Sequence, residues 1–122
     1  MIAPNLLNLY VDDPVRSAAF YRRLLARETV EHSPGFALFV FDNGFKLGLW
    51  ARDGVKPATT VPGGGGELCF HVDSDDDVHR LHRLWQEQGV EIVQAPEAMD
   101  FGYIFSGIDP DGHRLRVYRL TL

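Results

Sequence analysis

The sequence predicts an α+β fold in which a βαβββ unit occurs twice. The segment Leu7-x-Leu9-x-Val11-Asp12 recurs 61 residues later as Leu68-x-Phe70-x-Val72-Asp73. Both copies alternate apolar and polar residues with period 2, the pattern of a strand that places one face on a core. Both copies are followed by a helix start signal and then by further strand-like stretches. An internal repeat of this kind indicates two modules of the same architecture.

Local signals delimit the helix of each module. In the first, Asp13 is placed to cap the helix and Pro14 occupies the first helical position. In the second, the run Ser74-Asp75-Asp76-Asp77 resembles a capping box and places acids at the positive end of the helix dipole. We expect helices over Pro14–Ala26 and Asp75–Gln88, the second of which Gly89 ends.

The remaining strands are delimited by turn residues. Asn43-Gly44 predicts a two-residue type I′ hairpin, and Asp109-Pro110-Asp111-Gly112 predicts a second turn. The strands expected after the helices are Gly35–Phe41, Phe45–Trp50, Val90–Gln94, Phe101–Ile108 and His113–Leu120. Residues 51–65 contain two prolines and the start of a glycine run. We therefore expect a single domain, 1–122, with modules at about 4–50 and 66–120 joined by this linker.

Composition excludes several classes of function. The chain has 122 residues, 45% of them hydrophobic, and a net charge of −5, which suits one globular domain. No basic cluster favours a nucleic acid or an anionic membrane as partner, and no apolar run reaches the ~20 residues of a membrane span. The N-terminal segment Met1–Leu9 lacks the charged flank of a signal peptide. Cys69 is the only cysteine, which excludes an internal disulfide and a thiolate zinc cluster and suits a cytoplasmic protein.

Strand alternation sorts the side chains into two faces. We expect an aliphatic face under the helices, formed by Leu7, Leu9, Val11, Phe36, Leu38, Val40, Leu47, Leu49, Leu68, Phe70, Val72, Leu115 and Val117. The opposite face carries rings and a few polar groups: Leu6, Asn8, Tyr10, Lys46, Gly48, Trp50, Glu67, Cys69, His71, Arg116 and Tyr118. Pairing through the two expected two-residue turns adds Ala37, Phe39, Phe41, Phe101, Tyr103 and Phe105 to this face. Trp85 should be core, and His79 and His82 a solvated pair on their helix.

The chain resembles the vicinal-oxygen-chelate superfamily, which includes glyoxalase I, extradiol dioxygenases, and bleomycin- and fosfomycin-resistance proteins. The residues that carry the resemblance are Val11-x-Asp13-x-x-x-Ser17-x-x-Phe20-Tyr21 and Asp109-Pro110-Asp111-Gly112. The resemblance implies that the two modules curl into a cup of mixed sheet with the helices outside. In metal-dependent members, four inward His or Glu side chains hold one divalent ion that chelates the substrate.

The family spacing places those four ligand positions at Leu6, Gly48, Glu67 and Arg116. Only Glu67 could bind a cation, and a carboxylate that faces a guanidinium more readily forms an ion pair. We therefore expect no metal and no other cofactor.

Among metal-free members, the chain is most similar to antibiotic-binding resistance proteins of the phenazine-resistance type, and next to the bleomycin-resistance type. The segments that show the similarity to the phenazine-resistance type are Phe101-Gly102, Asp109-Pro110-Asp111-Gly112-His113 and Arg116-Val117, with Trp50 after an apolar strand. The resemblance implies a homodimer that sequesters a drug in its clefts and performs no chemistry. Each cup could be closed by one chain or shared by two.

We therefore expect a binding protein, rather than an enzyme, for a planar aromatic, antibiotic-like molecule. Lys46 and Arg116 favour a flat aromatic acid over a large cation. The expected ligand-binding residues are Trp50, Arg116, Glu67, Asn8, Tyr10, Phe39, His71, Phe101, Tyr103, Phe105 and Tyr118. Two alternatives stay open: a metal-dependent lyase or dioxygenase, and a metal-free isomerase or hydrolase with Glu67 or His71 as base.

Overall fold

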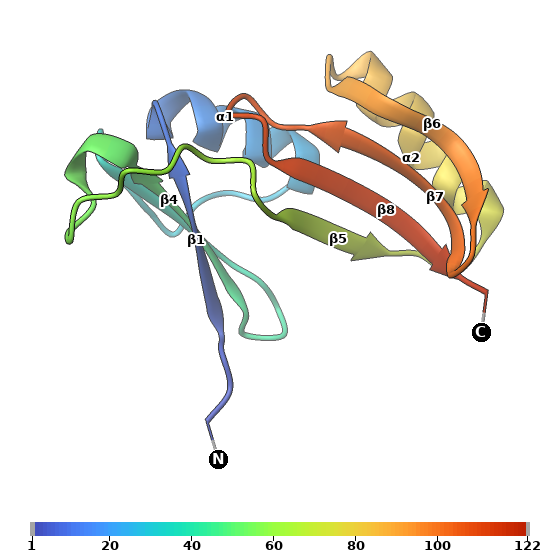
Figure 1. The fold of residues 1–122 in the computed structure, drawn as a ribbon, viewed down its shortest axis with the longest axis horizontal. Coiled ribbons are helices and arrows are strands. Elements are labelled where there is room, and N and C mark those ends of the chain that lie inside the picture. Colours follow the sequence, from blue (N-terminus) through green and yellow to red (C-terminus); the bar gives the residue numbers. More distant parts are fainter. Residues whose placement is uncertain (1, 122) are drawn as a thin grey trace. The chain divides into compact units, whose positions relative to one another are not determined.

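The computed structural model describes residues 2–121 and confirms the α+β class with two βαβββ modules (Figure 1). The chain divides into two compact units, unit 1 (Met1–Gly63) and unit 2 (Gly64–Leu122). Each unit contains one helix and one four-stranded mixed sheet. No helix among residues 2–121 is long and apolar enough to cross a membrane.

Unit 1 follows the predicted order of elements and adds two short ones. Its sheet has the order β1-β4-β3-β2, in which β1 runs parallel to β4 and the other neighbours are antiparallel. The short strand β2 and the 3-10 turn η1 were not predicted. The elements are β1 (Leu6–Val11), α1 (Pro14–Leu25), β2 (Glu31–His32), β3 (Phe36–Val40), β4 (Lys46–Ala51) and η1 (Arg52–Gly54).

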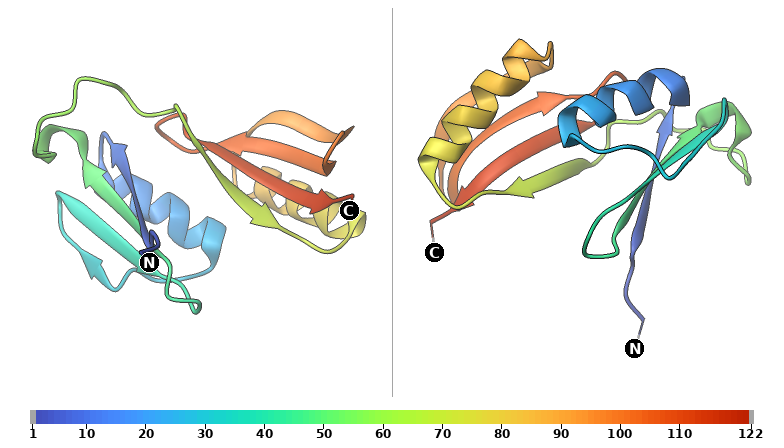
Figure 2. Two further views of the ribbon diagram at one scale, coloured as in Figure 1. Left: turned by 60° about the horizontal axis from the view of Figure 1, so that its bottom comes forward. Right: turned by 180° about the vertical axis from the view of Figure 1, so that it is seen from behind.

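Helix α1 begins and ends where its capping residues allow. The Asp13 carboxylate accepts hydrogen bonds from the backbone N–H groups of Val15 (3.0 Å) and Arg16 (3.3 Å), which have no partner within the helix. The helix ends at Ala26, whose left-handed backbone (φ 51°) terminates the helical hydrogen bonding. Its buried face, which includes Phe20 and Tyr21, packs on one side of the unit 1 sheet (Figure 2).

Unit 2 repeats this architecture with a longer hairpin. Its sheet has the order β5-β8-β7-β6, again with one parallel pair, β5 and β8. Strand β6 runs five residues beyond the predicted end at Gln94 and contains two register shifts. The elements are β5 (Glu67–His71), α2 (Asp75–Glu87), β6 (Glu91–Met99), β7 (Gly102–Ile108) and β8 (Arg114–Leu120).

Helix α2 covers one face of the unit 2 sheet (Figure 2). The Ser74 hydroxyl caps the helix by accepting a hydrogen bond from the Asp77 N–H at 3.1 Å. Trp85 is buried, as predicted, and its ring lies 5.7 Å from that of Phe70 and 5.1 Å from that of Phe105. These edge-to-face contacts form the centre of the unit 2 core.

The β3–β4 and β7–β8 hairpins close through three-residue loops rather than the predicted two-residue turns. In unit 1, the Phe41 N–H donates to the Phe45 carbonyl (2.8 Å) and Gly44 has φ +88°. In unit 2, the Asp109 N–H donates to the His113 carbonyl (2.9 Å) and Gly112 has φ +88°. A glycine in the left-handed region at the end of such a loop is the usual alternative to a type I′ turn.

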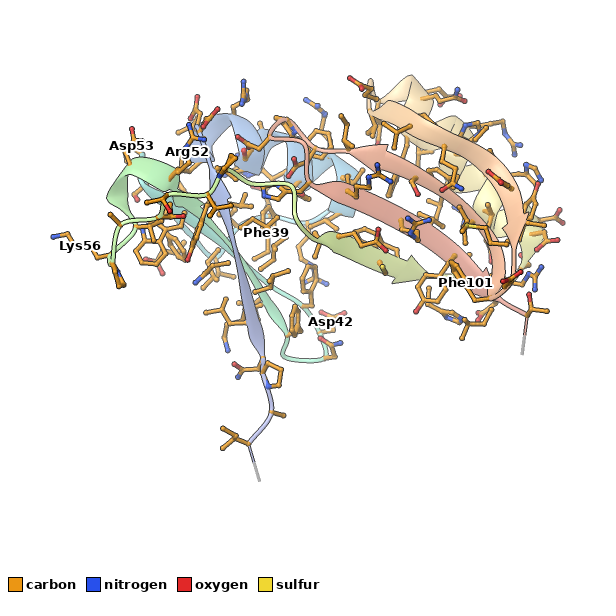
Figure 3. All side chains as sticks on the ribbon, in the orientation of Figure 1. Phe39, Asp42, Arg52, Asp53, Lys56 and Phe101 are labelled. Atoms are coloured by element: carbon orange, nitrogen blue, oxygen red, sulfur yellow. The ribbon has the colours of Figure 1, made fainter. Side chains whose placement is uncertain are left out.

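The extra loop residue moves the register by one position and reverses the faces of β3 and β7. Phe39 pairs with Leu47 rather than Gly48 and is fully buried on the α1 side (Figure 3), so its predicted place on the opposite face was wrong. The same correction applies to Tyr103 and Phe105, which face α2. The residues with reversed faces in β3 are Phe36, Ala37, Leu38, Phe39 and Val40.

Phe101 lies in the turn between β6 and β7, outside both strands (Figure 3). Its carbonyl accepts a hydrogen bond from the Thr121 N–H at 2.9 Å, and its side chain is 41% exposed. The predicted start of a strand at Phe101 is therefore one residue early, because β7 begins at Gly102.

Candidate functional site

The face of each sheet that lies away from its helix is its open face, and in unit 1 this face carries a row of rings. Tyr10, Trp50 and Phe36 are register partners on β1, β4 and β3. The Tyr10 and Trp50 rings meet edge to face, with centroids 6.3 Å apart and an interplanar angle of 77°. All three side chains are half-buried. This aromatic row (Tyr10, Trp50 and Phe36) is an exposed apolar surface that a flat ring could stack on.

The neighbouring row of unit 1 is tightly packed. It consists of Asn8, Gly48 and Leu38, which are also register partners. A Cβ atom on Gly48 would lie 2.1 Å from Asn8 Oδ1 and 3.1 Å from the Phe36 ring. Gly48 therefore leaves no free space beside Trp50, because the Asn8 side chain fills it. Asn8 Oδ1 is buried and has no hydrogen-bond partner among the described residues.

The open face of unit 2 carries an ion pair within a polar network. Arg116 Nε donates to Glu67 Oε1 (2.9 Å) and Arg116 Nη2 donates to Glu67 Oε2 (3.1 Å), which makes the pair bidentate. Arg116 Nη1 donates to Gln94 Oε1 (3.1 Å), which also accepts from the Ser106 hydroxyl (3.0 Å). We call Glu67, Cys69, Gln94, Ser106 and Arg116 the Arg116 cluster. The predicted ion pair is confirmed.

The pKa values of Glu67, Arg116 and the adjacent Cys69 are shifted from their ordinary values. The hydrogen bonds from Arg116 lower the pKa of the Glu67 carboxyl, and the carboxylate in turn raises the pKa of the guanidinium. Burial, together with a 3.5 Å hydrogen bond to Glu67, raises the pKa of the Cys69 thiol. A raised pKa favours the protonated thiol, which is the weaker nucleophile.

A second row on this face corresponds in topology to the aromatic row. His71, Tyr118 and Ile104 are register partners on β5, β8 and β7. The His71 and Tyr118 rings lie 5.5 Å apart, and the His71 side chain is 50% exposed. The nearest carboxylate to His71, that of Asp73, lies 3.9 Å away, beyond hydrogen-bond distance. Among residues 2–121, His71 thus has no carboxylate that orients it as one orients a catalytic base.

The four positions that correspond to metal ligands do not fit a divalent cation. Leu6 and Gly48 offer no donor, and both oxygens of Glu67 accept from Arg116. Arg116 itself would repel a cation. Across residues 2–121, no three or more His, Cys, Asp or Glu side chains are grouped so that they could hold a metal ion.

Two features of unit 2 were missed or misjudged in the sequence. Gln94 was not predicted as a site residue, because the register shifts of β6 break the alternation that assigns faces. His79 and His82 are half-buried and make contacts with β7, rather than forming a solvated pair. The His79 ring is hydrogen-bonded to the Tyr103 hydroxyl (3.1 Å), and the His82 ring packs 5.3 Å from Phe105. Burial lowers the pKa of His82.

A buried ion pair closes the β7–β8 hairpin. His113 Nδ1 lies 2.9 Å from Asp109 Oδ2, and Asp109 Oδ1 accepts from the backbone N–H groups of Asp111 and His113, both at 2.9 Å. The carboxylate raises the pKa of His113. This part of the second sequence motif therefore stabilises the loop that fixes the register.

The fold and these motifs define a class of protein. The sequence pattern of the Glyoxalase/Bleomycin resistance protein/Dioxygenase superfamily matches residues 3–117, and the chain belongs to this superfamily. The resemblance inferred from the motifs is thereby confirmed.

The chain is similar to individual proteins of known sequence or structure. The chain is 30% identical to the phenazine antibiotic resistance protein EhpR of Enterobacter agglomerans over 119 residues, which are 95% of this chain and 91% of EhpR. It is 49% identical to a protein of Agrobacterium tumefaciens solved by solution NMR, with a TM-score of 0.91 and complete coverage of both chains. A glyoxalase-related enzyme from Fulvimarina pelagi shares the fold (TM-score 0.85, 98% and 88% of the chains) at 22% identity.

Proposed function

We propose that this protein binds a planar aromatic small molecule and sequesters it without chemical conversion. The observation that carries the proposal is the aromatic row, which presents three half-buried rings on the open face of unit 1. Rings that stack contribute about 0.5–1.5 kcal/mol beyond the burial of their area. EhpR, described as a phenazine antibiotic resistance protein, supports an aromatic ligand of this kind.

The chemistry of the open faces favours binding over catalysis. The Cys69 thiol has a raised pKa, and Glu67 is held by Arg116. Among the described residues of these faces, His71 has no carboxylate within hydrogen-bond distance. A metal-dependent lyase or dioxygenase is disfavoured by the donor set, and an isomerase or hydrolase would need a free base at Glu67 or His71.

The proposed ligand contacts are assigned to each open face. On unit 1 they are Trp50, Tyr10 and Asn8, with Phe36 added by the corrected register. On unit 2 they are Arg116, Glu67, His71 and Tyr118. Phe39, Tyr103 and Phe105 are not included, because they face the helices. Phe101 is not included either, because it lies in a turn.

Truncation of Trp50 tests the proposal. We expect Trp50→Ala to weaken the binding of phenazine-1-carboxamide by roughly tenfold or more, because the stacking surface and its buried area are lost. Isothermal titration calorimetry measures this, and the melting temperature should change little because Trp50 is only half-buried. Phe45→Ala, which removes a half-buried ring from the β3–β4 loop, is the matched control. Equal binding by Trp50→Ala and the wild type would refute the assignment of the site.

We also propose that the protein is a homodimer. The outer strands of the two sheets are β1 and β2 in unit 1 and β5 and β6 in unit 2. Outer strands present unpaired backbone groups that favour association with another strand. Light scattering coupled to size-exclusion chromatography should give about twice the chain mass of 13.7 kDa. A mass of one chain at every concentration would contradict the proposal.

A further inference from the structure

We propose that the open face of unit 2 selects an uncharged polar group on the ligand, so that neutral aromatics bind in preference to their carboxylate analogues. This inference rests on the proposed function and adds the charge of the ligand to it. It replaces the expectation of a flat aromatic acid, which treated Arg116 as a free cation.

The first argument is that Arg116 is already occupied by an anion. A guanidinium has five N–H groups. In Arg116 two of these donate to the two oxygens of Glu67 and a third donates to Gln94. The side chain of Arg116 is only 15% exposed, against 36% for Glu67. The pair is therefore held in a partly buried place where water screens the charges less than at the surface.

The second argument concerns what an entering carboxylate would have to displace. To form a bidentate pair with Arg116, it would have to take the N–H groups that Glu67 holds. Glu67 would then keep its charge beside a second anion and lose its two hydrogen bonds from Arg116. A further carboxylate lies in the same network, because Gln94 Nε2 donates to Glu97 Oε1 at 3.1 Å. The exposed Arg114, a register partner of Glu67, is a further charge nearby, and solvent screens it.

The third argument is that a neutral acceptor meets no such cost. Five N–H groups less the three that donate leave two on Arg116. An amide carbonyl or a ring nitrogen could accept one of these while the Glu67 pair stays intact. Gln94 adds no free donor, because its amide N–H groups face Glu97 Oε1 and the Met99 sulfur. The face thus offers weak donors to a neutral group and no unpaired cation to an acid.

The test compares two ligands that differ only in charge. Calorimetry at pH 7.5 would measure the Kd of phenazine-1-carboxamide and of phenazine-1-carboxylic acid for the wild-type protein. We expect the amide to bind about tenfold more tightly, the ratio produced by the loss of one charge-assisted hydrogen bond. Glu67→Gln removes the competing anion, so the preference for the amide should fall by roughly tenfold. Glu91→Gln removes one negative charge from β6, where Glu91 is exposed, and should leave the preference unchanged.

The outcomes separate this inference from the proposed function. Tighter binding of the acid by the wild type would overturn the charge selectivity and leave aromatic binding in place. An unchanged preference in Glu67→Gln would show that the ion pair does not set the selectivity. Binding of neither ligand to the wild type would overturn the proposed function and this inference with it. The Kd values of the amide and the acid for the wild-type protein test the charge selectivity even if Glu67→Gln does not fold.

Discussion

The replacement of Phe105 with alanine tests whether β7 faces α2 as the three-residue loop requires. The Phe105 side chain is fully buried, and its ring lies 5.1 Å from Trp85 and 5.3 Å from His82. Truncation of a buried phenylalanine costs about 3–5 kcal/mol, through lost burial and the cavity that remains. A small domain has a free energy of unfolding of only about 5–15 kcal/mol. The variant should therefore lose about a fifth or more of its stability.

Urea unfolding followed by circular dichroism measures this loss. Phe101→Ala is a suitable control, because it also removes a phenylalanine ring. Phe101 lies in the β6–β7 turn and is 41% exposed, so its truncation should cost about 1 kcal/mol or less. A Phe105→Ala protein as stable as the wild type but unable to bind phenazine-1-carboxamide would refute the register. That result would place the ring on the open face, as a two-residue turn predicts.

Two further substitutions probe other local features. Gly48→Ala should weaken phenazine-1-carboxamide binding by roughly tenfold and lower the melting temperature, because the new Cβ would displace the Asn8 side chain. Binding as tight as that of the wild type, measured by calorimetry, would contradict this packing. The raised pKa of His113 means that its pair with Asp109 stabilises the fold fully below the ordinary pKa of about 6.5 and less as the pH rises through the raised value. The urea concentration at the unfolding midpoint should therefore decrease as the pH is raised from 6 to 9 in the wild type, and it should decrease less in His113→Gln. Equal pH profiles of the two proteins would show that the pair does not contribute to stability.

Local signals in the sequence were sufficient for the helices. Asp13 and Ser74 cap α1 and α2 as predicted, because a capping hydrogen bond involves only residues two or three positions apart. The hairpins were different. Asn43-Gly44 is compatible with a two-residue turn and with a three-residue loop that ends in a left-handed glycine. The choice between them depends on which strand faces pack against the helix, and that information is not local.

In the candidate site, too, positions set by local sequence were predicted correctly and positions set by the loop length were not. Trp50 and Tyr10 were placed on one face from their own strands, and their register agrees. Phe39, Tyr103 and Phe105 were placed through the turns, so a single wrong loop length in each hairpin misplaced all of them. The strands that needed no turn to assign their faces were correct.

The two matching hairpin loops have a consequence for how the side chains of the two units can be compared. Because Gly44 and Gly112 fix the same register in each half, equivalent positions on the two sheets can be compared one by one. The position that is Gly48 in unit 1 is Arg116 in unit 2, so the smallest side chain and a long cationic one occupy the same place on equivalent strands. The same backbone arrangement therefore accommodates two different side-chain chemistries at one position, and a change at this position in one unit leaves the strand pairing of the other unit intact.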